Sequence, residues 1–199
     1  KPKQVTKSLL TALPQRAREV IISRYGLSKD SKRMTLESIG KRYGITRERV
    51  RQIENYALAN IRKSEVYTRE KTAFQELEDV IHNLGGVVVE AELLNEVSKD
   101  KSNQNHLNLL LVLGNNFKKQ KEDEYFRFRW HADGDLCKQV EEALHKLYKN
   151  IKTDDILSES EIIKALLDHL KDVSEKYKNE EIVSRWLGLS KKIGKNPMG

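Results

Sequence analysis

Five side chains that can hydrogen-bond to nucleic-acid bases occur at helical spacing between residues 47 and 55. In a helix, positions i, i+1, i+4, i+5 and i+8 share one broad face. Arginine can bond guanine through two hydrogen bonds, glutamine or asparagine can bond adenine, and glutamate can accept from the amino group of cytosine. The spacing therefore predicts a helix face that reads base edges in the major groove of DNA. The side chains are Arg47, Glu48, Arg51, Gln52 and Asn55.

The competing interpretation is a solvated helix face whose charges pair within the helix. Glu48 and Arg51 are three residues apart, which allows such an ion pair. Arg47 and Arg51, however, are like charges one turn apart, and this arrangement is unfavourable in an isolated helix. An external anion would relieve the repulsion, so we favour the interpretation as a DNA-reading face.

A helix-turn-helix would position this face. The motif needs a small residue where its helices cross and a residue that tolerates left-handed backbone in the turn, which Gly40 and Gly44 supply. Thr35 is expected to cap the first helix, LESIGKRY, and Thr46 the second, which begins at Arg47. The inward-facing residues are expected to be Ile39, Tyr43, Ile45, Val50 and Ile53.

A further helix is predicted before this motif. In LPQRAREVIISRYGL, residues 13–27, apolar residues recur at helical spacing behind Pro14, and Gly26 ends the helix. The segment SKDSKRM that follows is a polar loop. The first module is therefore expected to span residues 1–66.

The positive charge of the chain belongs to its first third. The net charge is +7, but residues 1–70 have 17 Lys and Arg against 7 Asp and Glu, and residues 71–199 have 20 against 23. A compact basic module attached to a slightly acidic remainder is what binding to a polyanion requires.

Residues 35–64, TLESIGKRYGITRERVRQIENYALANIRKS, resemble region 4 of the housekeeping-type sigma factors of bacterial RNA polymerase. LPQRAREVIISRYGL resembles the helix that precedes it in that family, so the resemblance covers residues 12–64. It implies recognition of a promoter minus-35 element in double-stranded DNA, while an adjoining surface engages the flap of the polymerase core. It implies that base edges are approached by Arg47, Glu48, Arg51 and Gln52. It implies that the phosphate backbone is contacted by Arg24, Thr35, Leu36 and Arg49.

The chain departs from this family in three respects. About 130 residues follow the motif, where sigma factors normally end, and the aromatic segment that melts the minus-10 element is absent. The loop LSKDSKRM is also longer than the usual connection. The resemblance therefore implies promoter recognition and does not extend to promoter opening.

A second module is expected at residues 71–132. A helix with one apolar stripe ends at the Gly85–Gly86 pair, VVV at 87–89 is a candidate strand, and two helices follow, in EAELLNEVSKD and around the apolar run 107–113. FKKQKEDEYFRFRW then predicts a hairpin whose turn is KEDE, because aromatic and basic residues alternate in it. This is the element order of a winged helix. The apolar stripe consists of Phe74, Leu77, Ile81 and Leu84.

The hairpin has two possible roles. As a wing that touches nucleic acid, it would direct Lys118, Lys119, Arg127 and Arg129 outward. As a structural hairpin, it would close the core of its own module. The slightly acidic charge of residues 71–199 leaves both interpretations open.

Residues 134–199 are expected to form a second, degenerate winged-helix-like unit. ELEDVIHNL at 76–84 matches QVEEALHKL at 139–147, and LGNNFKK at 113–119 has an echo in LGLSKK at 187–192, with an insertion of about 11 residues around KNIKTDDILSES. Ser158 and Glu161 predict a capping box for its second helix, and Trp186 and Leu187 would anchor its third. Its wing would follow Gly199 and is missing. Chance similarity between two amphipathic helices is the alternative.

The predicted fold class is therefore mainly α, with three small modules: a sigma region-4-like helix-turn-helix followed by two winged-helix-like units with short β-hairpin wings. The last two modules resemble HARE-type winged helices and the N-terminal domain of the polymerase delta subunit. HARE-type modules occur together with nuclease and modification domains, so the resemblance also suggests a role as a nuclease accessory or modification enzyme. The sequence has no carboxylate cluster with the spacing of metal ligands, which such a role would need.

Enzymatic chemistry has little support in the sequence. There is no Gly-rich phosphate loop, no G-x-S-x-G elbow and no HExxH pairing. Cys137 is the only cysteine and is expected to be a small, partly buried helix residue. No apolar run approaches the roughly 20 residues that span a bilayer. We expect a cytoplasmic, nucleoid-associated protein that is not an enzyme and needs no cofactor or metal.

The predicted function is sequence-specific promoter binding in transcription initiation, by a sigma-like factor that contacts RNA polymerase. The alternative is an adaptor or regulator that binds polymerase, in which the helix-turn-helix and the winged modules mediate protein contacts.

Overall fold

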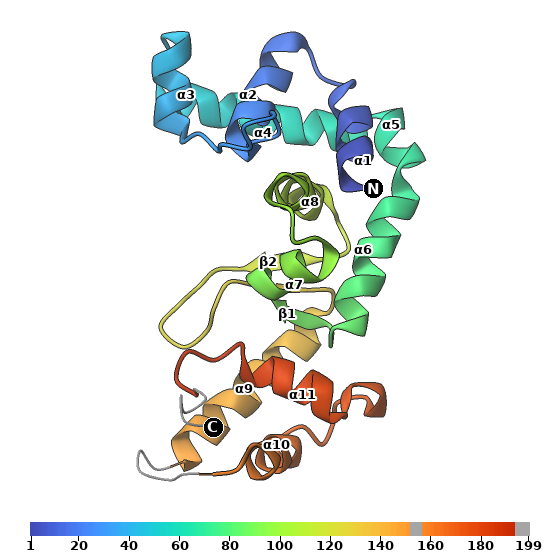
Figure 1. Cartoon of the computed structure of the whole chain (residues 1–199), viewed down its shortest axis with the longest axis vertical. Coiled ribbons are helices and arrows are strands. Elements are labelled where there is room, and N and C mark those ends of the chain that lie inside the picture. The colour runs from blue at the N-terminus through green and yellow to red at the C-terminus, as the bar shows by residue number, and fades with distance from the viewer. Residues whose placement is uncertain (152–156, 194–199) are drawn as a thin grey trace. The chain divides into compact units, whose positions relative to one another are not determined.

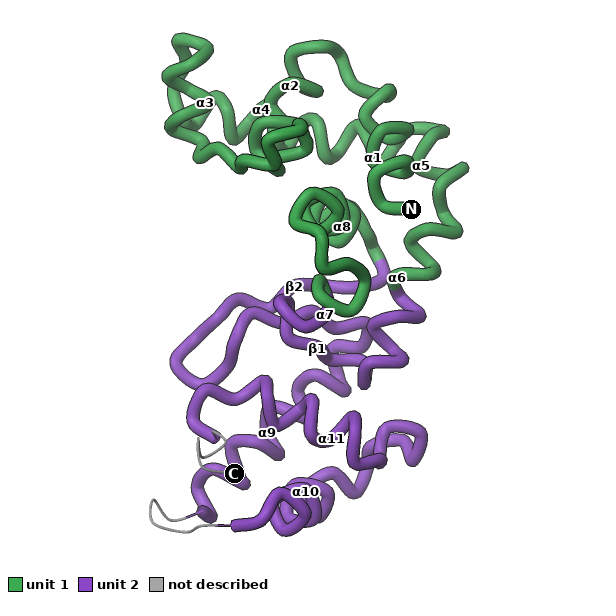
Figure 2. The backbone as a smooth tube through the Cα atoms, in the orientation of Figure 1, with its two compact units in different colours: residues 1–77, 94–115 green, residues 78–93, 116–199 purple. Residues whose placement is uncertain are grey.

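A computed structural model of the chain describes residues 1–151 and 157–193 (Figure 1). Contacts within it form two compact units (Figure 2). Unit 1 consists of Lys1–Leu77 and Leu94–Asn115, and unit 2 of Glu78–Leu93 and Asn116–Gly199. The boundaries of these units differ from those of the three predicted modules, at 1–66, 71–132 and 134–199, and the three-module division stays a prediction.

Unit 1 is helical in the part of the chain described. Two helices cross the boundary between the units along the chain: α6 begins in unit 1 and ends in unit 2, and α7 begins in unit 2 and ends in unit 1. The helices are α1 (Pro2–Leu10), α2 (Gln15–Tyr25), α3 (Leu36–Tyr43), α4 (Arg47–Lys63), α5 (Glu65–Arg69), α6 (Lys71–Asn83), α7 (Glu90–Val97) and α8 (Lys101–Leu113).

The predicted start and stop signals of the helix-turn-helix are confirmed. The hydroxyl of Thr35 accepts from the backbone N–H of Ser38 at 3.1 Å, and that of Thr46 accepts from the N–H of Arg49 at 3.1 Å. Gly44, which ends α3, has a left-handed φ of 65°. Gly26 has the same φ at the end of α2. Local chemistry therefore determines where these helices begin and end.

The core of the helix-turn-helix joins α2, α3 and α4, which pack on one another (Figure 1). Val20, Ile39 and Val50 are each 0% exposed and form its centre. Of the predicted inward-facing residues, Tyr43, Ile45 and Ile53 are partly buried against this centre. The predicted inward face is therefore confirmed.

Helix α8 lies outside the predicted first module but packs within unit 1. It contacts α1, α2 and α4. Besides its leucines, it buries three polar side chains, Asn105, His106 and Asn108. Its C-terminal carbonyls are held by unit 1 side chains: Arg62 Nε donates to Leu113 O at 3.1 Å, and Tyr67 Oη donates to the same oxygen at 3.0 Å.

The buried imidazole of His106 predicts a pH-dependent stability of unit 1. Its Nδ1 lies within hydrogen-bond distance of Thr6 Oγ1, and its Nε2 has no hydrogen-bond partner among the described residues. Burial, with Lys3 and Lys7 nearby, lowers the pKa of His106 below its usual 6.5. The unfolded chain therefore binds this proton at a higher pH than the folded chain, and stability that is present above pH 6.5 is lost as the pH falls below it.

This dependence can be measured by chemical denaturation at pH 7 and pH 5, with His106→Gln as the comparison. The variant is expected to lose less stability between the two pH values than the wild type, because glutamine does not titrate. An equal loss in both proteins would contradict the role of His106.

Unit 2 contains a three-stranded antiparallel sheet. Its strands are β1 (Val87–Val89), β2 (Lys118–Gln120) and β3 (Arg129–His131), in the order β1-β3-β2. His131 pairs with Val87 on one side and with Lys118 on the other. The predicted strand at VVV and the predicted hairpin are confirmed, but the connection between the paired strands spans residues 121–128 and is longer than the predicted turn KEDE.

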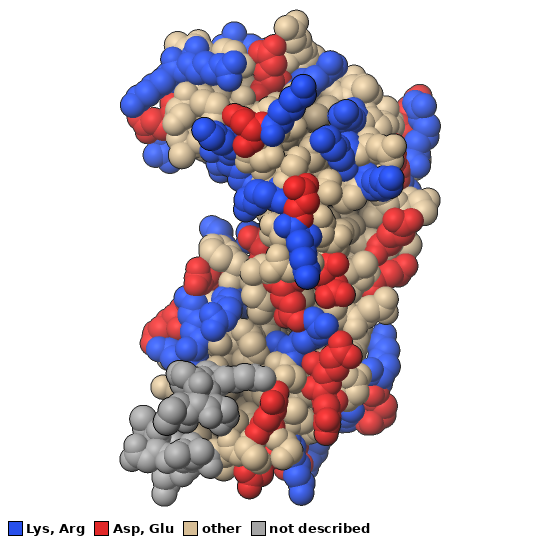
Figure 3. All heavy atoms as spheres, viewed as in Figure 1, with Lys and Arg blue, Asp and Glu red and all other residues tan. Residues whose placement is uncertain are grey.

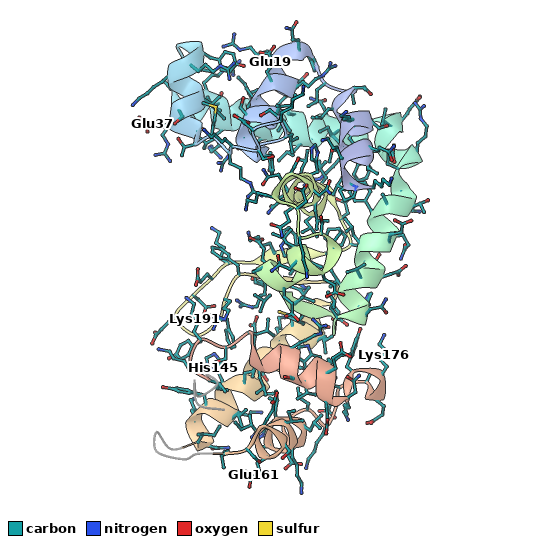
Figure 4. All side chains as sticks on the ribbon, viewed as in Figure 1. Glu19, Glu37, His145, Glu161, Lys176 and Lys191 are labelled. Atoms are coloured by element: carbon teal, nitrogen blue, oxygen red, sulfur yellow. The ribbon has the colours of Figure 1, made fainter. Side chains whose placement is uncertain are left out.

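The connection 121–128 is wide because it is held against the C-terminal part of unit 2. Phe126 is 4% exposed and forms an antiparallel bridge with Ser190. Lys191 lies beside the connection (Figure 4) and donates from Nζ to Asp123 O at 2.8 Å. The prediction of a tight turn at KEDE is wrong because contacts with residues 190 and 191, far along the chain, hold residues 123 and 126 away from a compact turn.

Of the two interpretations left open for the hairpin, the wing would direct Arg129 outward, but the structure buries this residue. Its side chain is 4% exposed and donates from Nε to Glu141 Oε1 at 2.6 Å. Lys119 Nζ lies 2.5 Å from Glu90 Oε2, and Arg127 Nε donates to Gly188 O at 3.0 Å. These contacts favour the structural interpretation of the hairpin over a wing that touches nucleic acid.

Helices complete unit 2. They are α9 (Gly134–Asn150), α10 (Glu159–Asp168), the short 3-10 helix η1 (Glu175–Tyr177) and α11 (Glu180–Leu187). The capping box of Ser158 and Glu161 is present, and Trp186 is 0% exposed, as predicted. These helices share one core with Val87 of β1 and with Phe126. The two winged-helix-like units stay a prediction, and the predicted insertion falls partly at residues 152–156, outside the described residues.

The structure also bears on the single cysteine, on metal binding and on membrane-spanning helices. Cys137 lies on a helix as predicted, but at 2% exposed it is more deeply buried than the partly buried residue expected. Burial, with Glu141 beside it, raises the pKa of its thiol to about 12. Within residues 1–151 and 157–193, no group of three His, Cys, Asp or Glu side chains is arranged to hold a metal. No described helix is both long and apolar enough to cross a membrane.

Candidate nucleic-acid interface

Helix α4 separates an apolar face from a polar one. Val50, Ala57 and Ile61 are each 0% exposed and pack into unit 1. The four side chains predicted to read bases are all exposed, together with Asn55, because they lie off this apolar stripe. The structure therefore brings together Arg47, Glu48, Arg51, Gln52 and Asn55.

Arg51 and Glu48 form a two-point ion pair on this face. Arg51 Nε donates to Glu48 Oε2 at 2.9 Å, and Arg51 Nη2 donates to Glu48 Oε1 at 2.7 Å. The hydrogen bonds from Arg51 lower the pKa of Glu48, and those to Glu48 raise the pKa of Arg51. The pairing considered in the competing interpretation is therefore present in this structure.

This pairing leaves the arginine accessible. Both side chains are 55% exposed, and water and salt screen an ion pair at such a site, so a stronger anionic or hydrogen-bonding partner can replace it. Arg49 Nη1 donates to Gln52 Oε1 at 3.0 Å in a similarly exposed contact. Arg47 forms no ion pair with any described residue. The face is therefore a set of exposed donors and acceptors with weak partners.

The N-terminus of α3 is the second part of the candidate interface. The first backbone N–H groups of a helix have no partner within it and carry a partial positive charge, so they attract phosphate. Thr35, at the N-cap, is exposed, and Leu36 is half-buried with its side chain against the helix-turn-helix core. Thr35 and Leu36 are therefore placed where a phosphate contact would use the backbone and the hydroxyl rather than the leucine side chain.

Arg24 is placed differently from the other predicted phosphate contacts. Its Nε lies 3.5 Å from Glu54 Oε2, and its Nη1 donates to Met34 O at 3.3 Å. The side chain is 37% exposed. Arg24 therefore ties α2 to α4 and to the segment before α3, and only part of its guanidinium is accessible.

Gly40 sets the distance between α3 and the turn. A Cβ at this position would lie 2.6 Å from Ile45 O, a backbone atom. At Gly44 a Cβ would meet nothing within 4 Å, so that glycine is required for its left-handed φ and not for space. The orientation of α4 relative to α3 therefore depends on a missing side chain at Gly40.

An apolar groove of about 430 Å³ lies beside the polar face of α4. Pro14, Ile45, Ile53 and Tyr56 line it, together with the arginines Arg16 and Arg49 among others. Tyr56 is 57% exposed, and this aromatic residue was not singled out from the sequence. The sequence feature that could have indicated Tyr56 is its position on α4 outside the predicted apolar stripe.

Asn105 has a structural role in unit 1 that was not predicted from the sequence. It lies on α8 and is 0% exposed, yet its side chain bonds to the segment between α2 and α3. The signal was the polar residues within the apolar run NQNHLNLLLVL, because buried amides need hydrogen-bond partners. The sequence could not name those partners.

Basic side chains gather over the part of the chain that holds α1 to α4, in the view of Figure 3. Acidic residues are present there too, among them Glu19 on α2 and Glu37 on α3 (Figure 4). The positive excess of residues 1–70 therefore lies on the same unit as the polar face of α4.

Comparison with known proteins identifies this part of the chain. Residues 9–63 match the family Sigma-70, region 4. The chain is 46% identical over 55 residues to the RNA polymerase principal sigma factor HrdD of Streptomyces viridifaciens, which covers 28% of the chain and 16% of that protein. It is 46% identical over 70 residues to the RNA polymerase sigma factor RpoS of Coxiella burnetii, covering 35% and 19%.

A third relative is the RNA polymerase sigma factor RpoD of Helicobacter pylori, 48% identical over 56 residues, which covers 28% of the chain and 8% of that protein. The chain thus spans less than a fifth of the length of these curated relatives. No solved structure gives a significant match. Residues 9–63, which contain α2, α3 and α4, are a Sigma-70 region 4 domain.

Proposed function

We propose that the protein is a sequence-specific DNA-binding transcription initiation factor that recognises a promoter minus-35-type element through α4. The observation that supports this most is the exposed face of α4, whose donors and acceptors have only weak partners. Arg47, Glu48, Arg51 and Gln52 would approach base edges, because each has the hydrogen-bonding groups that base recognition requires. Thr35, Leu36 and Arg49, with the accessible part of Arg24, would contact the phosphate backbone.

The Glu48–Arg51 pair has a place in this function. An arginine held by a carboxylate on its own helix loses less side-chain freedom when it binds, because its rotamer is already restricted. Glu48 also keeps acceptor capacity for cytosine. In the complex, Arg51 would exchange part of this pairing for guanine or phosphate oxygen.

The experiment is a titration of the wild type and Arg51→Ala with a minus-35 duplex and a scrambled duplex at several salt concentrations. The variant is expected to lose roughly 5- to 150-fold of the preference for the minus-35 duplex, the range for one two-point base contact. Arg69→Ala is the matched control, because Arg69 is an exposed arginine of unit 1 that also pairs with a glutamate on its own helix. It is expected to keep the preference. Equal binding of both duplexes by the wild type would contradict base reading.

The second candidate function is a polymerase-binding adaptor, and the apolar groove beside α4 favours it. A groove with an exposed tyrosine and two lining arginines fits an apolar protein segment with acidic flanks. We propose the flap of the polymerase core as this partner. A pull-down with core polymerase that persists without DNA and is lost in Tyr56→Ala would support contact through the groove. Retention in Tyr56→Ala would place the contact elsewhere.

We also propose that the parts of the chain at 71–132 and 134–199 are winged-helix-like modules. The order helix, strand, helix, helix, strand, strand from α6 to β3 supports this for the first of them. The buried Arg129 and the paired Lys119 favour a structural role for its hairpin, so protein contacts suit these modules better than DNA contacts.

A further inference from the structure

The connection between α2 and α3, residues 27–34, is a basic segment next to the candidate interface. It contains Lys29, Lys32 and Arg33 against one acidic residue, Asp30. Lys29 and Lys32 are exposed and form no salt bridge with any residue that the structure describes. Asp30 is engaged locally, since it accepts from Ser28 Oγ at 2.8 Å and from the backbone N–H of Lys32 at 3.3 Å. The connection therefore has a positive excess.

This connection is held in a defined conformation by Asn105 of α8. Asn105 Nδ2 donates to Gly26 O and to Ser31 O, both at 2.9 Å, and Arg33 Nε donates to Asn105 Oδ1 at 2.8 Å. Ser31 has a φ of 52°, which is unusual for a serine, and its carbonyl is one of the two that Asn105 binds. One buried side chain therefore holds two points of the connection and the residue that precedes it.

The end of the connection is fixed as well, and it leads directly into α3. Met34 N–H donates to Ser23 O at 2.9 Å, and Met34 O accepts from Arg24 Nη1 at 3.3 Å. The next residue is Thr35, the N-cap of α3. The lysines of the connection therefore lie on a short, anchored segment beside the helix N-terminus assigned to phosphate.

We propose that the connection 27–34 is an additional phosphate-contacting element, which binds through Lys29 and Lys32 and is held in position by Asn105. The inference rests on the proposed DNA binding and extends it to residues outside the base-reading face. Lysine is a compact point charge that suits phosphate, and phosphate contacts fix position without reading sequence. A segment ordered in advance loses little entropy when it binds. Asn105 itself is a positioning residue that does not touch DNA.

The first test is the double variant Lys29→Gln/Lys32→Gln in the full chain, titrated with duplex DNA across salt concentrations. Each phosphate contact contributes about 0.9 to the slope of log affinity against log salt, so the slope is expected to fall by about 2. Affinity for minus-35 and scrambled duplexes should fall by the same factor, because phosphate contacts do not discriminate. Lys146→Gln/Lys149→Gln on α9, two exposed lysines with the same charge change, is the control and should keep the slope.

The second test is Asn105→Ala. It is expected to reduce the slope towards that of the lysine variant and to accelerate amide exchange in residues 27–34. Combined with the lysine variant, it should lower the slope no further, because the lysines are the groups that Asn105 positions. Asn108→Ala is the control, since Asn108 is a 7% exposed amide on the same helix without a side-chain hydrogen bond to a described residue. A merely structural role would lower the melting temperature and leave the slope unchanged.

The outcomes separate this inference from the proposed function. An unchanged slope in the lysine variant, with a wild type that prefers the minus-35 duplex, would overturn the inference alone. A wild type without salt-dependent DNA binding would overturn both. Unchanged exchange of residues 27–34 in Asn105→Ala would overturn the positioning role of Asn105.

Discussion

Gly40→Ala is expected to destabilise the helix-turn-helix by about 2–3 kcal/mol, enough to disorder α3 and α4 relative to each other. The added Cβ would lie 2.6 Å from Ile45 O, and a backbone atom cannot move aside without displacing the turn. The start of α4 would shift with it, so binding to a minus-35 duplex should be lost together with the stability.

Hydrogen exchange of the amides of residues 36–63 measures this effect locally, which avoids treating a chain of two units as two-state. Gly44→Asn is the matched control. It lies four residues away in open space, and asparagine tolerates the left-handed backbone there, so its effect should be less than half as large. Similar exchange in Gly40→Ala and the wild type would show that the two helices do not need the close approach.

Trp186→Ala is expected to destabilise unit 2 by about 3–5 kcal/mol, the cost of deleting a large buried aromatic side chain. Trp186 is 0% exposed, and its Nε1 donates to Gly85 O at 3.1 Å. Its removal would leave a cavity between α11 and the segment before β1, and it would leave the Gly85 carbonyl without this donor. Trp186→Phe should have an intermediate effect, because it keeps most of the ring volume and loses the hydrogen bond.

Hydrogen exchange of the amides in α9 and α11, measured by mass spectrometry, would report the loss of stability in unit 2. Tyr148→Ala is the control, because Tyr148 is an aromatic residue on α9 of the same unit that is 42% exposed. Its removal should change the stability of unit 2 by less than about 1 kcal/mol. If both substitutions had the same small effect, α11 would not belong to the core of unit 2.

The local features of the helix-turn-helix could be predicted because they depend on neighbouring residues. A threonine hydroxyl caps a helix that starts beside it, and a glycine with positive φ ends one. The same holds for the capping box of Ser158 and for the strand at Val87–Val89, which a short β-branched run predicts. The inward and outward faces of α4 follow from helical periodicity alone.

The candidate site could be predicted only in part. The exposed face of α4 was predicted, and its base-reading role stays a prediction. The engagement of Arg24 with Glu54 and Met34, and the groove at Tyr56, depend on how α2 lies against α4. Residues of one element cannot indicate which residues of another element will meet them.

The sequence by itself determined a basic helix-turn-helix with its caps, its buried stripe and its polar face, because these follow from spacing and backbone preference within about 30 residues. Tertiary structure decided that Arg129 is buried, that Phe126 meets Ser190, and that Asn105 holds a connection more than 70 residues before it. The physical reason is that a buried polar group must find a partner, and the fold determines which partner is near. Those long-range hydrogen bonds tie α8 to the connection that precedes α3.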